Sequence, residues 1–104
     1  MERFDARTIV LREKIYKELK VTFQGIEQQI KNLEDKKTEI LMKCEMYEEC
    51  LDKHLLSSGS DIIKEHLSQA RLELANTDIE IERLKLEKDA YRIEISVQEE
   101  QMRQ

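Results

Sequence analysis

The sequence predicts an all-α fold: an antiparallel coiled-coil helical hairpin of two long helices, expected to assemble into a dimer or a higher bundle. The first observation is composition, because 104 residues include no Pro and only two Gly, which leaves few turns. The second is a heptad spacing of apolar residues along most of the chain. The third is a single strong break, "SSGS", at Ser57 to Ser60.

The boundaries of the two helices follow from this break. We expect a first long helix over residues 3–56, a turn over 57–60 and a second long helix over 61–104. Ser60 is the expected N-cap, and Asp61 then lies in the first turn, where the helix dipole favours a carboxylate. So short a loop requires antiparallel neighbours. Met102 still occupies a seam position and no stop signal follows, so we expect the second helix to be truncated from a longer coiled coil.

Both expected helices carry a heptad seam, the line of residues that faces the other helix. Its positions alternate steps of four and three residues. In the second helix they are 63, 67, 70, 74, 77, 81, 84, 88, 91, 95, 98 and 102, and in the first they are Leu19, Phe23, Ile26, Ile30, Leu33, Lys37, Ile40, Cys44, Tyr47 and Leu51. Closing the chain at residues 58 and 59 predicts that the numbers of facing residues add up to about 117. Layers in which an a position of one helix faces a d position of the other require a sum of 114 or 121. The sequence therefore does not decide the register.

Polar residues interrupt the seam at a few places. Lys37 and Lys88 are the most polar of them. A polar seam residue usually selects register and partner number at a cost in stability. A lysine also extends its ammonium to the edge of the seam, where we expect Glu34 or Glu80 to meet it.

The start of the first helix departs from the heptad. Phe4, Thr8, Leu11, Ile15 and Leu19 are spaced by four, three, four and four residues. The extra step of four either unwinds the supercoil locally or rotates the apolar stripe toward another neighbour.

A glycine inside the first helix raises a separate question. Gly25 costs about 1 kcal/mol relative to Ala in a helix. It is either a tolerated surface residue or a kink that lets residues 3–24 swing out as a separate helix. We expect one continuous helix.

The second helix has a second apolar stripe, which we call the outer stripe. Leu72, Ile79, Leu86 and Ile93 recur every seven residues at heptad position f, normally the most solvated position, and Val97 extends the stripe. We therefore expect these five residues to bind a partner. The occupant is a second hairpin, the N-terminal segment folded back, or a different protein, and a homodimer requires the fewest assumptions. On the outer face of the first helix, Leu41, Met42 and Met46 could add to such a surface.

Charge and hydropathy narrow the class of partner. The net charge is −5 and the pI near 5.2, which argues against non-specific binding of nucleic acid or anionic membrane. Basic residues nevertheless gather near the start of the chain, at Arg3, Arg7, Arg12, Lys14, Lys17 and Lys20. In an antiparallel hairpin they lie near the acidic end of the second helix. No run approaches the roughly 20 apolar residues of a membrane span, so we expect no membrane insertion and a cytoplasmic protein.

Few residues offer chemistry. Cys50, His54 and His66 would meet near the turn with Asp61 as a weak fourth ligand, but their spacing fits no compact zinc motif, so no metal is expected. Cys44 and Cys50 point in different directions on one helix and are expected to be reduced. No pocket is expected between two helices, so we expect no catalytic residue, no cofactor and no enzyme activity.

One stretch resembles a known family. In "LREKIYKELKVTFQGIEQQIKNL", residues 11–33, the elements Ile15, "KELK" at Lys17 to Lys20, Val21, Gly25 and Glu27 are similar to the opening of HR1 repeats. These are antiparallel coiled-coil fingers by which Rho effector proteins bind Rho-type small GTPases. The resemblance covers about a fifth of the chain, and "TFQ" between Val21 and Gly25 is one residue longer than that pattern. It implies a GTPase-binding finger.

Together these observations predict a non-enzymatic module for self-association and protein scaffolding. We expect it to belong to a larger cytoplasmic protein of the trafficking, cytoskeletal or centrosomal kind. The alternative is an effector finger that binds a Rho-type small GTPase.

Overall fold

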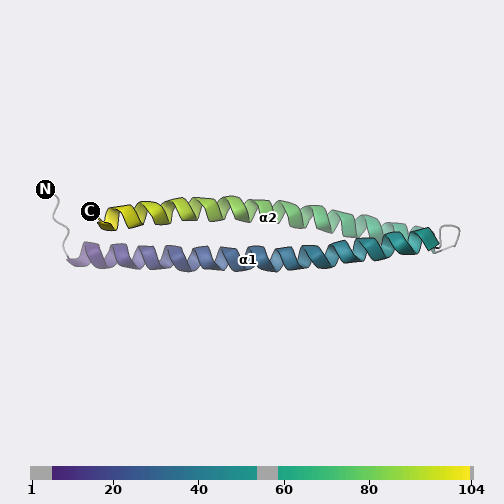
Figure 1. Cartoon of the computed structure of the whole chain (residues 1–104), viewed down its shortest axis with the longest axis horizontal. Helices are drawn as coiled ribbons and strands as arrows, with labels where there is room; N and C mark the ends of the chain where they lie inside the picture. The colour runs from purple at the N-terminus through teal and green to yellow at the C-terminus, as the bar shows by residue number, and fades with distance from the viewer. Residues whose placement is uncertain (1–5, 54–58, 104) are drawn as a thin grey trace. The chain divides into compact units, whose positions relative to one another are not determined.

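The computed structural model consists of two long α-helices. Helix α1 spans Ala6–Lys53 and helix α2 spans Ser60–Arg103 (Figure 1). The structure describes residues 6–53 and 59–103. Residues 3–5 and 54–56 of the expected first helix, residues 57–58 of the expected turn and Gln104 of the expected second helix therefore lie outside the described residues. All described residues except Gly59 are helical, as the sequence predicts. The all-α helical hairpin is therefore confirmed.

Helix α2 begins one residue earlier than expected. The Ile63 amide donates to the Gly59 carbonyl at 3.2 Å, which is the first hydrogen bond of the helix. The residue whose carbonyl accepts that bond occupies the N-cap, so Gly59 takes this position. Ser60 is the first helical residue rather than the cap, and Asp61 lies in the first turn as expected.

The chain divides into two units, and each helix contributes to both. Unit 1 takes Met1–Ile30 and Leu84–Gln104, and unit 2 takes Lys31–Arg83. Within each unit the α1 segment and the α2 segment run side by side in opposite directions (Figure 1). The seam between them forms the core.

Unit 2 holds the best-buried part of the seam. Ile40 and Cys44 of α1 pack with Leu67 and Ala70 of α2, and each is no more than 6% exposed. Tyr47, Leu51 and Leu74 pack against this cluster. Every one of these residues occupies a seam position expected from the heptad.

Unit 1 is less fully buried, and its seam differs from the expected one before Leu19. Leu11 and Ile15 are 56% and 38% exposed, so they do not belong to the seam. Arg12 and Tyr16 are the half-buried residues instead, and the Tyr16 hydroxyl donates to Glu99 Oε1 at 2.9 Å. The extra step of four therefore turns the apolar residues away from α2.

Contacts between the helices fix the register that the sequence left open. Residue numbers add up to 115 for Tyr16–Glu99 and Lys88–Glu27 in unit 1 and for Lys37–Asp78 in unit 2. They add up to 113 for the stacked rings of Tyr47 and His66. The remaining ion pairs between the helices add up to 109 for Lys36–Glu73 and 119 for Arg71–Glu48, five on either side of 114. The contacts therefore centre on 114, one of the two registers that mix positions a and d, and not on 121.

Gly25 does not break α1. The helix is continuous through it, and a Cβ added there would meet no atom within 4 Å. The expectation of one continuous helix is confirmed, and the fold itself does not need glycine at this position.

We predict that Gly25→Ala stabilises the protein. Alanine removes most of the cost of a helical glycine, about 0.5 to 1 kcal/mol, and its methyl group enters open space. Urea unfolding followed by circular dichroism measures the change. A lower midpoint would show that Gly25 is required by the fold.

We also predict that Ile40→Ala destabilises the protein by about 2 to 4 kcal/mol, because a buried methylene-rich side chain leaves a cavity in the seam. Met42→Ala, two residues away and exposed, is the matched control and should change the free energy of unfolding by less than about 0.5 kcal/mol. Equal losses in both variants would contradict the assignment of the seam.

Candidate functional site

Helix α2 carries two apolar stripes, the seam and the outer stripe, and α1 covers the seam. Leu74, Ile81, Leu84, Tyr91 and Ile95 are buried or half-buried, and each lies in the unit where α1 covers it. This stripe therefore holds the hairpin together and leaves no surface for a partner.

The outer stripe of α2 has no cover from α1. Leu72 and Ile79 in unit 2 are 63% and 66% exposed, and Leu86 and Ile93 in unit 1 are 72% and 64% exposed. Val97 is 42% exposed. All five predicted partner-binding residues are thus on the surface of the hairpin.

The equivalent positions of α1 are mostly polar. Position f of α1 holds Arg7, Lys14, Val21, Gln28, Asp35, Met42 and Glu49, all exposed. Leu41, Met42 and Met46 are exposed as well, so unit 2 shows a small apolar area on α1. A seven-residue apolar repeat on the outside is specific to α2.

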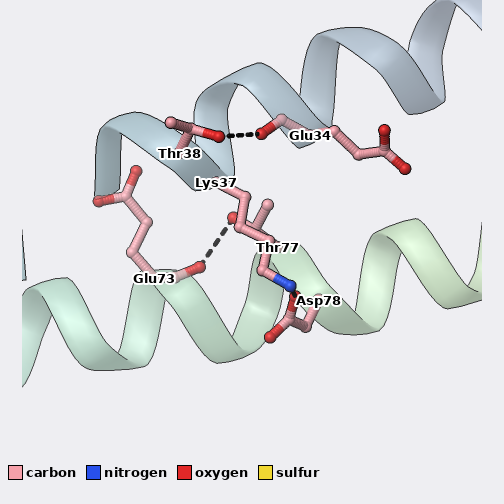
Figure 2. Close-up of polar contacts among 6 residues, drawn as sticks. All are labelled: Glu34, Lys37, Thr38, Glu73, Thr77 and Asp78. Atoms are coloured by element: carbon pink, nitrogen blue, oxygen red, sulfur yellow. Dashed lines mark hydrogen bonds and ion pairs between the residues drawn. The ribbon is translucent and has the colours of Figure 1, made fainter. Parts of the chain in front are cut away.

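A polar layer crosses the seam of unit 2, as Figure 2 shows. Lys37 extends from α1, and its Nζ lies 2.7 Å from Asp78 Oδ1 on α2. Beside it Thr77 is only 5% exposed, and its hydroxyl donates to the Glu73 carbonyl at 2.8 Å. On α1 the Thr38 hydroxyl donates to the Glu34 carbonyl in the same way. The hydrogen bond to Asp78 raises the pKa of Lys37 above its ordinary 10.5.

Lys88 in unit 1 also lies at a seam position and places its ammonium at the edge of the seam. Its Nζ lies 5.6 Å from the centroid of the Phe23 ring and 3.6 Å from Glu27 Oε2. Both seam lysines therefore reach the edge of the seam as expected, but their ion pairs do not involve the expected Glu34 or Glu80, although the charge of Glu34 also raises the pKa of Lys37. The carboxylates that meet them lie on the opposite helix, whereas Glu80 pairs with Arg83 on its own helix.

The hairpin gives little support for chemistry at its cysteines and histidines. Cys44 is buried, Cys50 is exposed, and both are free thiols. His66 stacks on Tyr47 with ring centroids 5.8 Å apart, and His54 lies outside the described residues. Among residues 6–53 and 59–103, no group of three His, Cys, Asp or Glu side chains is placed to hold a metal ion. Over the same ranges neither helix contains a stretch apolar and long enough to cross a membrane.

A further exposed apolar area, not expected from the sequence, lies on α1 of unit 1. Val10 and Val21 are 64% and 68% exposed, and with Lys14 and Lys17 they line a shallow hollow. The four residues are spaced by four, three and four, which places them on one face of the helix. That spacing was readable in the sequence, but the expected seam at Leu11 and Ile15 obscured it.

Known proteins offer no assignment for this chain: no protein family, no curated protein and no solved structure matches it.

The ion pair of the polar layer predicts a pH dependence. A lysine whose pKa is raised on folding stabilises the fold below its unfolded-state pKa, and this contribution is lost as the pH rises through the folded pKa. Asp78→Asn should therefore lower the melting temperature at pH 7, and the difference from wild type should shrink as the pH rises beyond 10.5.

Glu80→Gln is the control for this experiment. Glu80 pairs with Arg83, which stays charged, so its effect should not change over that alkaline range. The bond to Arg83 lowers the pKa of Glu80, so the Glu80→Gln difference should shrink only as the pH falls below 4.5. An Asp78→Asn effect that persists at high pH would contradict the role given to Lys37.

Proposed function

We propose that this chain is a non-enzymatic module that associates with copies of itself, as a homodimer or a larger bundle, within a cytoplasmic scaffold protein. The observation that carries the proposal is the exposure of Leu72, Ile79, Leu86 and Ile93 at one heptad position of α2. Single exposed apolar residues are common on soluble proteins, but a regular series is typical of a covered interface.

The expected free energy of association favours a reversible complex. Burying one Leu or Ile side chain contributes about 1.5 to 3 kcal/mol, so four contribute about 6 to 12 kcal/mol. Loss of translational and rotational freedom costs about 4 to 15 kcal/mol. The two terms are comparable, which places the expected dissociation constant near the micromolar range or above it.

A second copy is the simplest occupant of the outer stripe. Most soluble oligomers are built from identical chains, and coiled-coil hairpins commonly join into bundles. Helix α1 covers the seam side of α2 and leaves the outer stripe exposed, which supports a surface of another chain as its cover.

The proposal predicts that Leu72→Gln/Ile79→Gln/Leu86→Gln loses self-association, because glutamine keeps the helix but removes the apolar contact. Light scattering coupled to size exclusion, from about 1 μM to about 1 mM, spans the expected affinities. Wild type should rise in mass with concentration, and the triple variant should stay at the mass of one chain.

Ile62→Gln is the matched control. Ile62 lies on the same helix and is 61% exposed, but it lies outside the outer stripe. This variant should associate like wild type. A wild-type chain that remains a monomer up to 1 mM would refute the proposal.

An alternative function is an effector finger for a Rho-type small GTPase. What favours it is that Lys17, Lys20, Val21 and Gly25, which carry the HR1 resemblance, are all exposed on α1. Isothermal titration with a Rho-type GTPase, loaded either with a non-hydrolysable GTP analogue or with GDP, tests it. Binding to the GTP form alone would support this function, and no binding to either form would exclude it for the GTPase used.

A further inference from the structure

The outer face of α1 in unit 1 contains cations and apolar groups but no carboxylate. We call it the basic face; its residues step by three or four along the helix on the side opposite the seam. Its members are Arg7, Val10, Lys14, Lys17, Val21, Gly25 and Gln28, all exposed. Glu13 and Glu18 lie beside this face and line the same hollow as Val10, Lys14, Lys17 and Val21.

Gly25 supplies a second, independent observation about this face. The hairpin has open space where its Cβ would be, yet glycine costs about 1 kcal/mol in a helix. An exposed helical glycine uncovers the backbone and allows another chain to approach closely. The fold gains nothing from this residue, whereas a docked helix would.

The outer face of α2 in unit 1 has the complementary character. We call it the acidic face; it consists of Leu86, Asp89, Ile93, Val97 and Glu100, which are all exposed. Arg92 lies beside this face and lines the same hollow as Ile93, Val97 and Glu100. Asp89 and Glu100 pair with Arg92 at 2.8 Å and Arg103 at 3.8 Å on their own helix. Such exposed pairs contribute little, so these carboxylates can exchange partners at small cost.

We infer that the basic face of one copy of this chain binds the acidic face of a second copy. The inference rests on the proposed self-association and adds the surface that receives the α2 stripe in unit 1. Both faces combine exposed apolar side chains with charge of one sign, so docking buries valine, leucine and isoleucine while lysine meets carboxylate. Gly25 lets the two helices lie close together.

This contact is heterologous, because it joins two different surfaces. In unit 1 the basic face points away from α2 and the acidic face points away from α1. Each copy can therefore bind one neighbour through each face, and association need not stop at a dimer. A contact between two α2 stripes would use the same surface twice and would close as a dimer.

Two variants that each lack one face provide the test. Leu86→Gln/Ile93→Gln removes two apolar side chains of the acidic face, and Lys14→Glu/Lys17→Glu reverses the charge of the basic face. Each alone should have the mass of a monomer at concentrations where wild type associates. Mixed in equal amounts they should form a heterodimer, because one intact face of each kind remains, and light scattering should report twice the mass of one chain.

Two further variants separate docking from folding. Lys31→Glu/Lys43→Glu makes the same charge change at exposed positions of α1 in unit 2 and should associate like wild type. Gly25→Gln adds a better helix former, so its melting temperature should not fall, yet its association should weaken at least tenfold because the side chain blocks close approach.

The outcomes distinguish this inference from the proposed function. If Lys14→Glu/Lys17→Glu and Gly25→Gln keep the wild-type mass while Leu86→Gln/Ile93→Gln loses it, the basic face is not the partner surface, and self-association through α2 still stands. A mixture that remains monomeric also overturns the inference. A wild-type chain that is monomeric throughout overturns both.

Discussion

The antiparallel seam in a single register is the constraint on which the rest of the structure depends. The residue sums of the paired side chains centre on 114 in both units, which aligns positions a of one helix with positions d of the other. Because side-chain direction along a helix is fixed by spacing, the seam positions themselves, which the registers of 114 and 121 share, decide what remains outside. Leu72 and its heptad equivalents become an external stripe only because Leu74 and its equivalents are internal.

The polar residues of the seam fit this register better than a register shifted by one heptad. Lys37 meets Asp78 and Lys88 meets Glu27, in each case across the seam, and buried Thr77 bonds to a carbonyl of its own helix. Among the described residues no buried side-chain nitrogen or oxygen lacks a hydrogen-bond partner. A shift by one heptad would keep apolar residues facing one another but would separate these charges, which is how polar layers select a register.

Much of the fold could be predicted from the sequence, because heptad spacing and one break determine two helices and their facing residues. The register could not, since a loop near residues 58 and 59 permits several alignments and only side-chain contacts choose among them. The start of the seam was misjudged at Leu11 and Ile15: hydrophobicity favoured them, whereas the geometry gives Tyr16 the place beside Glu99. The outer stripe could be predicted from its seven-residue spacing, and the structure leaves it exposed. The exposed valines of α1, Val10 and Val21, were overlooked because Leu11 and Ile15 had been assigned to the seam.

The register can be tested with one native cysteine. Cys44 and Ala70 belong to the same buried cluster and their numbers add up to 114, whereas Cys44 would face Thr77 in the register of 121. In a Cys50→Ser background, Ala70→Cys should oxidise to an intrachain disulfide, measured by thiol titration and by mass under denaturing conditions. Thr77→Cys in the same background should stay reduced. Oxidation of the Thr77→Cys protein with Ala70→Cys left reduced would contradict the register.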